Sequence, residues 1–255
     1  MSIVDDSQRS QYANEGFLTI NNLLSYEELE RLCLRMTEIA EGCVPTFSAD
    51  YIEYEPGPHR VRDASTIRKI NRCAENEETF MAHASNSRIL DIISELIGPD
   101  IKLFGSQCFM KPPGGIEKPY HQDSAYFTIE PRELVTCWTA LDDVTLDNGC
   151  LWVIPGSHRG ELLDHDQPWD VGDRVDMQVR DDQIDHKREV PIELKAGSCS
   201  FHHSMLLHRS GPNQTQNSRR GLAVHYMSSQ SRWTDGTQTK PKYILLRGKE
   251  YDGCV

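Results

Sequence analysis

Tyr120-His121-Gln122-Asp123 is the stretch of sequence that constrains the fold most strongly. In a β-strand, residues i and i+2 point to the same side. His121 and Asp123 can therefore face one metal ion while Gln122 points away. A third ligand must then come from a distant strand that folding brings alongside, and His208 is the candidate. Two imidazoles and one carboxylate can occupy one face of a metal and leave the opposite face open.

The residues after His208 indicate what the open face could accept. The chain continues as RSGP (209–212) and reaches Arg219 in the next predicted strand. An arginine forks onto a carboxylate through two parallel hydrogen bonds, which a lysine cannot do. A 2-oxoglutarate chelated to iron needs such a partner for its far carboxylate, and Ser210 could add a hydroxyl donor. This constellation is typical of non-haem Fe(II) oxygenases.

Three stretches carry a resemblance to a known family: PYHQDSAYF (119–127), LVTCWTALDDVTLDNGCLWVIPGSH (134–158) and FHHSMLLHRSGPNQTQNSRRGLAVHYM (201–227). The opening YANEGFLTINNLLSYEELERL (12–32) and the ending RGKEYDGCV (247–255) support it. The chain resembles the phytanoyl-CoA dioxygenase family of Fe(II)/2-oxoglutarate oxygenases along nearly its whole length. The resemblance implies a mainly β fold with flanking helices, a cupin-like double-stranded β-helix or jelly roll.

The resemblance also implies cofactors and site residues. Fe(II) is expected on His121, Asp123 and His208, with 2-oxoglutarate and O2 as co-substrates and ascorbate as a stimulant. The residues implied to contact 2-oxoglutarate are Lys69, Gln107, Trp138, Ser210 and Arg219. Gln107 departs from the family pattern, which has a methionine at this position. The implied reaction hydroxylates an unactivated C–H bond of a small molecule and releases succinate and CO2.

Neighbouring histidines and an arginine compete for these roles. His202 and His203 lack a serine and an arginine at the right offsets, and strand alternation predicts that His203 faces the site while His202 points away. Arg219 and Arg220 are adjacent, so only one can face the pocket, and the family spacing selects Arg219. His158, which lies in a family turn, is interpreted as structural.

Further side chains are candidates for substrate contact because they flank the ligand strand or lie in aromatic and basic stretches. They are Tyr51, Tyr54, Arg60, Arg62, Tyr120, Gln122, Ser124, Tyr126, Phe127, Trp152 and His225.

The 255 residues and 29.1 kDa suit one domain over 1–255, with a helical flank and a first strand in 1–100 and the jelly-roll core in 101–255. The net charge of −12 argues against nucleic acid and anionic membranes as partners. The opening MSIVDDSQRS contains no apolar run. The eight cysteines are scattered without a CxxC pair, which predicts reduced thiols in a cytoplasmic protein. We expect a small-molecule substrate and a monomer or homodimer.

Local patterns predict the elements. Ser25 and Glu28 form a capping box for a helix to about Gly42, and a second helix runs from Ser87 to Gly98-Pro99. Asp147-Asn148-Gly149 predicts a hairpin turn. Residues 159–188 form a long polar stretch, either a solvated surface insertion or an active-site lid. Strands are predicted at 16–20, 101–109, 134–144, 150–154, 190–194, 198–202 and 219–228.

Two other functions remain open from the sequence. A non-catalytic, metal-binding jelly roll could act as a sensor or scaffold, although an intact His121, Asp123, His208 and Arg219 set argues against it. The same cofactors could also drive desaturation, ring formation or epimerisation. Halogenating relatives replace the ligand carboxylate with a small residue, so the presence of Asp123 favours hydroxylation.

Overall fold

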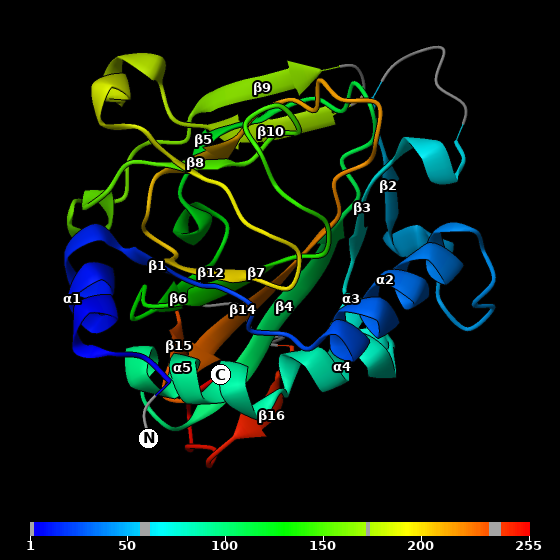
Figure 1. Cartoon of the computed structure of the whole chain (residues 1–255). Coiled ribbons are helices and arrows are strands. Elements are labelled where there is room, and N and C mark those ends of the chain that lie inside the picture. The colour runs from blue at the N-terminus through cyan, green and yellow to red at the C-terminus, as the bar shows by residue number, and fades with distance from the viewer. Residues whose placement is uncertain (1–2, 57–61, 172–173, 235–240) are drawn as a thin grey trace.

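Two antiparallel β-sheets face each other across the protein (Figure 1). The computed structural model describes residues 3–56, 62–171, 174–234 and 241–255. The larger sheet has the order β1 (Phe17–Ile20), β12 (Cys199–His203), β7 (Val135–Ala140), β14 (Gly221–Ser228), β4 (Ile101–Phe109), β3 (Ile67–Asn71) and β2 (Ile52–Tyr54), with β16 (Ile244–Arg247) paired to β4. The smaller sheet has the order β11 (Val190–Ile192), β8 (Leu151–Val153), β13 (His208–Ser210) and β5 (Lys118–His121). The predicted jelly roll is confirmed.

The remaining elements surround these sheets. Two short ribbons pair β9 (Gln167–Val171) with β10 (Arg174–Gln178), and β6 (Ile129–Glu130) with β15 (Arg232–Trp233). The α-helices are α1 (Asp6–Glu15), α2 (Tyr26–Ala40), α3 (Cys73–Asn76), α4 (Glu78–Ala84) and α5 (Ser87–Ile97). The 3-10 helices are η1 (Ala49–Tyr51), η2 (Ala64–Thr66), η3 (Asp123–Ala125), η4 (Ser157–Arg159), η5 (Asp181–Gln183) and η6 (His186–Arg188). Within the described ranges, no helix is long and apolar enough to cross a membrane. All eight cysteines are free thiols.

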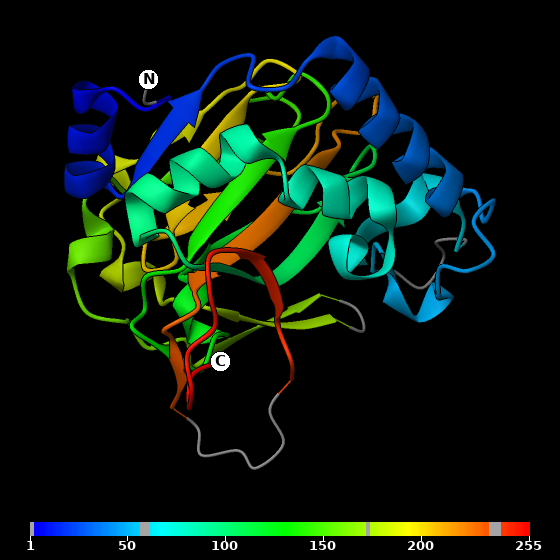
Figure 2. The same cartoon turned by 90° about the horizontal axis from the view of Figure 1, so that it is seen from below.

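The hydrophobic core lies between the larger sheet and the helices. Figures 1 and 2 show α2, α4 and α5 on one face of this sheet, and α5 contacts β4, β7 and β14. Met36 of α2 and Ile93 of α5 are buried in the same cluster as Val224 of β14. The opposite face turns toward the smaller sheet, where Trp138 and Val153 share a second cluster. Because side chains alternate along a strand, each central strand serves both the core and the space between the sheets.

The helices begin where their capping residues predict. The Ser25 backbone N–H donates to Glu28 at 2.7 Å, and the Glu28 backbone N–H donates to the Ser25 hydroxyl at 3.2 Å. The resulting helix, α2, ends at Ala40, slightly before the predicted Gly42. The second predicted helix is α5, which ends at Ile97 and is followed by the capping residue Gly98, where φ is +93°. A similar capping box at Asp5 starts α1, which the sequence analysis missed because its helix has no apolar stripe.

The prediction of a hairpin at Asp147-Asn148-Gly149 is wrong. A turn is present, and Gly149 has the positive φ of +87° that favours glycine there. However, β7 before it belongs to the larger sheet and β8 after it belongs to the smaller one. The turn therefore carries the chain from one sheet to the other, which local turn chemistry cannot reveal.

Residues 159–188, predicted as a long polar stretch, contain regular structure. They contain the β9–β10 ribbon, and the Val179 backbone N–H donates to the Tyr120 carbonyl at 2.9 Å. Val179 is buried with Leu163 and Ile184 packed beside it, against Tyr120 and Leu207. Figure 1 shows the ribbon lying against the smaller sheet, on the side away from the helices. The sequence analysis overlooked Leu163, Val179 and Ile184 because acidic residues dominate the composition of this stretch.

Core packing predicts a large difference between two aliphatic truncations. Ile93→Ala should lower the free energy of unfolding by about 2–5 kcal/mol, because Ile93 is fully buried. Leu34→Ala is the control, since Leu34 is 61% exposed and its loss should change that free energy by about 0.5 kcal/mol or less. Urea denaturation measures both. Similar losses in the two variants would contradict the packing described here.

Candidate functional site

A cavity of about 230 Å³ lies between the two sheets. Strands β3, β4, β7, β12 and β14 of the larger sheet and β5 and β13 of the smaller sheet contribute side chains to its wall. The predicted site residues that line it are Lys69, Gln107, His121, Asp123, Tyr126, Phe127, Trp138, His208, Ser210, Arg219 and His225. The fold thus brings residues from the whole length of the chain to one place.

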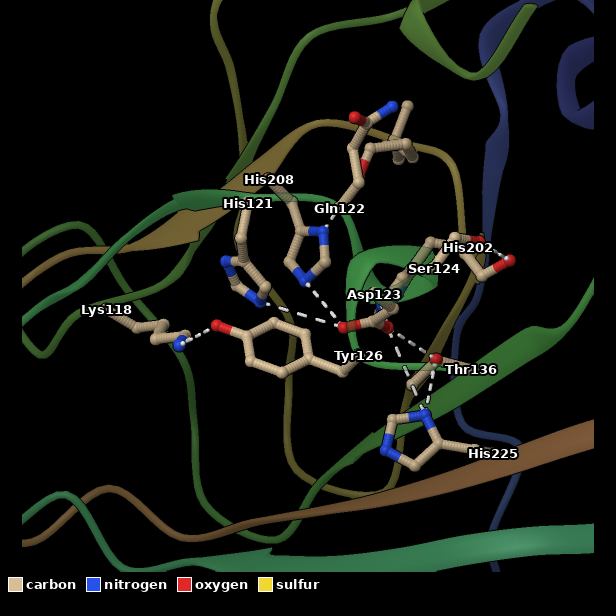
Figure 3. Close-up of polar contacts among 12 residues, drawn as sticks. Lys118, His121, Gln122, Asp123, Ser124, Tyr126, Thr136, His202, His208 and His225 are labelled. Atoms are coloured by element: carbon tan, nitrogen blue, oxygen red, sulfur yellow. Dashed lines mark hydrogen bonds and ion pairs between the residues drawn. The ribbon is translucent and has the colours of Figure 1, made fainter. Parts of the chain in front are cut away.

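The side chains of His121, Asp123 and His208 converge in this cavity (Figure 3). His121 of β5 lies directly opposite His208 of β13 in the antiparallel register. The Nε2 atoms of His121 and His208 lie 3.6 and 3.7 Å from Oδ1 of Asp123. The candidate ligand atoms all lie within 4.8 Å of one another. Two imidazole nitrogens and a carboxylate oxygen this close together match the donor set of non-haem iron, so these residues fit Fe(II).

Asp123 is not on a strand, which corrects one premise of the sequence analysis. Strand β5 ends at His121, and Asp123 begins η3. The backbone of Gln122 between them is still extended, with φ −115° and ψ 129°. One extended residue is enough to keep its two neighbours on a common side, so His121 and Asp123 face the same way although the strand is shorter than assumed.

Gln122 points away from the cavity and is fully buried. Its side-chain amide donates to the Met205 carbonyl at 2.8 Å, and its side-chain oxygen accepts from the Leu163 backbone N–H at 2.8 Å. Its own backbone N–H donates to Nε2 of His165 at 2.8 Å. Two segments, one with Leu163 and His165 and the other with Met205, therefore fix the residue that separates two candidate ligands.

Both candidate ligand imidazoles are oriented by the backbone. Nδ1 of His121 lies 2.8 Å from the Pro119 carbonyl oxygen, and Nδ1 of His208 lies 2.9 Å from that of Leu206. A ring nitrogen must carry its hydrogen to donate to a carbonyl, so each Nε2 keeps a lone pair for a metal. Burial lowers the pKa of His121 well below its ordinary value, and His208 and Lys118 add to the effect. The ring is therefore neutral at pH 7, as a metal ligand must be.

The carboxylate of Asp123 is held through its other oxygen. The Thr136 hydroxyl donates to Oδ2 at 3.0 Å and lies 2.8 Å from Nδ1 of His225 (Figure 3). Because the hydroxyl has one hydrogen, His225 must be the donor in the second contact. His202 Nε2 lies 3.8 Å from the same Oδ2. Burial alone would raise the pKa of Asp123, but the surrounding imidazoles, led by His208, bring it below its ordinary value.

Arg219 has the features of a carboxylate-binding residue. It is 3% exposed, and its guanidinium lies 5.1 Å from the centroid of the Trp138 ring. One of its N–H groups donates to the Gly149 carbonyl at 3.2 Å, whereas its buried Nε has no hydrogen-bond partner among the described residues. Burial lowers the pKa of Arg219 to about 10, so it remains charged at pH 7. A buried charged donor without a partner is costly, so the distal carboxylate of 2-oxoglutarate fits here.

Arg220 takes a different position, as the family spacing predicts. Its guanidinium makes two hydrogen bonds to Asp142, at 2.9 and 2.7 Å, and it does not line the cavity.

The predicted orientations of His202 and His203 are reversed. His202 lines the cavity, whereas His203 packs 5.3 Å from His158 on the other side. The face of each residue is set by the pairing of β12 with β7, in which His202 lies opposite Thr136, another residue of the cavity wall. Alternation then turns His203 away, and this pairing cannot be read from the sequence. His158 does not line the cavity, in agreement with a structural role.

Several candidates for substrate contact lie outside the cavity wall. Ser124 donates to the Ser204 hydroxyl at 2.8 Å, and Trp152 stacks against Arg209 at 4.8 Å. The other described candidates that do not line the cavity are Tyr51, Tyr54, Arg62, Tyr120 and Gln122. Arg60 lies outside the described residues.

Several residues of the cavity wall escaped the sequence analysis, and Thr136 and Lys111 are the two that matter most for the site. Thr136 could have been found, because it precedes Trp138 by two positions on β7 and so shares its face. Lys111 follows the end of β4 and lines the cavity, but it belongs to no periodic element. Its position comes from tertiary folding alone.

Comparison with known proteins identifies relatives over nearly the whole chain. The family model described as phytanoyl-CoA dioxygenase matches residues 12–221. The peroxisomal phytanoyl-CoA dioxygenase of Homo sapiens is 30% identical over 251 residues, which cover 93% of this chain and 72% of that protein. Because that relative is peroxisomal, the cytoplasmic location of this chain stays a prediction.

Solved structures share the fold. The non-heme monooxygenase ThoJ superposes with a TM-score of 0.74 at 25% identity, covering 96% of this chain and 85% of that one. The epimerase SnoN, in complex with Fe³⁺, alpha ketoglutarate and nogalamycin RO, gives 0.73 at 20% identity, covering 95% of this chain and 98% of that one. The likeness to SnoN concerns the fold alone.

The contact between Thr136 and Asp123 predicts a specific loss. Thr136→Val should weaken binding of a divalent metal by about 10–100-fold, because such supporting hydrogen bonds orient ligands. Thr139→Val is the matched control, since Thr139 is buried on the same strand but contacts His83 and Cys199 instead. Anaerobic calorimetric titration with Fe(II) measures both variants. Equal metal affinity in the two would show that Thr136 does not support the carboxylate.

Proposed function

Because this chain belongs to the phytanoyl-CoA dioxygenase family and is thus a 2-oxoglutarate-dependent dioxygenase, we propose that it hydroxylates a C–H bond of a small organic molecule. Fe(II) is held by His121, Asp123 and His208, and succinate and CO2 are the co-products. The observation that carries the proposal is the convergence of these three donor atoms in one cavity with the buried Nε of Arg219, which has no hydrogen-bond partner among the residues that the structure describes.

When bound, iron and 2-oxoglutarate supply the oxidising chemistry, and the chain positions them. His121 and His208 can present Nε2 lone pairs because their Nδ1 hydrogens are engaged by backbone carbonyls. Asp123 presents Oδ1 while Thr136 holds Oδ2. This leaves the three donors on one side and the opposite side open toward the cavity, as the reaction requires.

Arg219 and Ser210 bind the distal carboxylate of 2-oxoglutarate. Trp138 forms the wall beside it, and its ring lies so close to Gly221 that a Cβ there would come within 2.2 Å of it. Gly221 thus leaves room for the Trp138 ring at this point. Lys69, which also pairs with Glu53 at 3.3 Å, and Gln107 line the same cavity and contact the co-substrate.

Hydroxylation is favoured by the presence of a carboxylate at position 123. A carboxylate ligand supplies negative charge to the metal and fills the position that a halide would need. Tyr126 and Phe127 line the cavity next to this ligand and contact the organic substrate. Epimerisation is the second candidate, since SnoN, an epimerase, shares the fold. Neither assignment depends on ascorbate, which stays a predicted stimulant.

We also propose that residues 1–255 act as a single dioxygenase domain. Strands β1 and β16, from opposite ends of the chain, are hydrogen-bonded into the same larger sheet. Residues 101–255 supply the ligands, but β3 in the first hundred residues also contributes Lys69 to the cavity.

The reaction is tested by substrate-stimulated turnover under labelled oxygen. Candidate small molecules are screened for succinate release, and products are examined by mass spectrometry with ¹⁸O2 and chloride present. We expect a product that carries one labelled oxygen, and Asp123→Gly should lose most activity because an anionic ligand is missing. A chlorinated product, an unlabelled product two mass units lighter, or a product of unchanged mass and inverted configuration would each refute hydroxylation.

The role of Arg219 is tested by binding. Arg219→Ala should weaken 2-oxoglutarate binding by a factor of tens to thousands, since losing a buried charge-assisted pair costs about 2–5 kcal/mol. Fe(II) binding should remain nearly intact. Arg220→Ala is the control, because its partner Asp142 is outside the cavity wall. Unchanged 2-oxoglutarate affinity in Arg219→Ala would remove the residue from this role.

A further inference from the structure

Lys111 is a second buried cation in the cavity, and no step described so far uses it. The residue is 6% exposed and lines the cavity together with Arg219. Its ammonium donates to the Ser210 hydroxyl oxygen at 3.1 Å and to the Gly211 carbonyl. Ser210 is one of the two residues assigned above to the distal carboxylate of 2-oxoglutarate. Lys111 therefore lies beside that carboxylate position.

Neither cation has an ion-pair partner there. Among the described residues, no carboxylate lies within 4.0 Å of the Lys111 ammonium or the Arg219 guanidinium. Burial, followed by the neighbouring positive charges of Arg219 and Arg68, lowers the pKa of Lys111 well below its ordinary value. Two buried cations side by side are unfavourable unless an anion compensates them. Lys111 and Arg219 therefore favour the binding of a negatively charged group at this position.

The backbone holds Lys111 in a conformation that few residues adopt. Its φ is +26°, in the region that disfavours side chains with a Cβ. Its carbonyl accepts two hydrogen bonds, from the Arg219 backbone N–H at 3.1 Å and the Asn213 side chain at 2.9 Å. Gly149 packs against its stem, since a Cβ at Gly149 would lie 3.0 Å from Cδ of Lys111. The surrounding structure therefore determines where the ammonium lies.

We propose that Lys111 binds the distal carboxylate of 2-oxoglutarate together with Arg219 and orients the Ser210 hydroxyl toward it. An ammonium can only donate hydrogen bonds, so Ser210 Oγ must accept from it. The hydroxyl hydrogen of Ser210 is then free to point at the carboxylate. Lys111, Arg219 and Ser210 then all present donors to the carboxylate, which makes Lys111 a determinant of selectivity for a 2-oxo diacid over a 2-oxo monoacid. The inference rests on the proposed 2-oxoglutarate site.

The experiment compares two ligands on the Fe(II)-loaded protein under nitrogen, by calorimetric titration. The ligands are 2-oxoglutarate and 2-oxopentanoate, which has the same carbon chain without the distal carboxylate. Lys111→Met should weaken 2-oxoglutarate binding at least tenfold, as for a lost buried charge pair. It should change 2-oxopentanoate binding less than about threefold. The ratio of the two Kd values should therefore collapse, which a purely structural defect would not produce.

Lys102→Met is the matched control. Lys102 is also a buried lysine, 4% exposed, but it belongs to β4 and its ammonium donates to the Val255 carbonyl at 2.5 Å, outside the cavity wall. Its loss should leave the Kd ratio unchanged. Lys111→Gln keeps a hydrogen-bond donor without the charge, so it should lose most of the same selectivity, and it replaces Lys111→Met if that variant does not fold.

Three results overturn the inference in distinguishable ways. Unchanged Kd values for both ligands in Lys111→Met and Lys111→Gln overturn the role of Lys111 while leaving the proposed function intact. An equal weakening of both ligands shows that Lys111 only maintains the cavity, and it also overturns the inference. Failure of the wild-type protein to bind 2-oxoglutarate overturns the proposed function and this inference together.

Discussion

The antiparallel pairing of β5 with β13 sets His121 directly opposite His208, and the arrangement of the site depends on this register. The two ring centroids lie 4.2 Å apart. A slip of one residue would turn one imidazole to the other face of the sheet. Asp123 follows two residues after His121, so it needs no strand of its own. Supporting groups come from the larger sheet, which closes over the smaller one and supplies Thr136 and His225.

The charges of the cavity differ from those of the chain as a whole. The protein carries a net charge of −12, yet Lys111 and Arg219 are buried together between its sheets. A cation surrounded by low-dielectric protein attracts an anion more strongly than one in water. Such a cavity can concentrate a small dianion although the chain repels it at long range. The acidic residues that give the protein its net negative charge, which favours solubility, are thus separate from the buried cations Lys111 and Arg219 that bind the co-substrate.

The sequence was sufficient to predict residues whose roles follow from ligand chemistry. It was not sufficient to place residues whose orientation depends on which sheet their strand joins. His121, Asp123 and His208 were found because their residue types and spacing restrict the chemistry to a few possibilities. His202 was misplaced because its pairing with Thr136 of β7, which sets its face, cannot be read from the sequence. The turn at Asp147-Asn148-Gly149 was misassigned because the strands before and after it join different sheets. Lys111 gave no local signal, since its position is set by Asn213 and by the backbone of Arg219.

The hydrogen bonds around Gln122 have a consequence for protein engineering. Residues 159–188 are an obvious segment to exchange with a relative, because they lie outside the two main sheets. Yet Leu163 and His165 of this segment hold Gln122, the residue between His121 and Asp123. A graft that omitted these two contacts would remove hydrogen bonds from Gln122 and so weaken the positioning of His121 and Asp123 on either side of it. No residue of the cavity wall would be altered. Chimaeras should therefore join downstream of His165, so that a new outer segment is introduced while the original ligand geometry is retained.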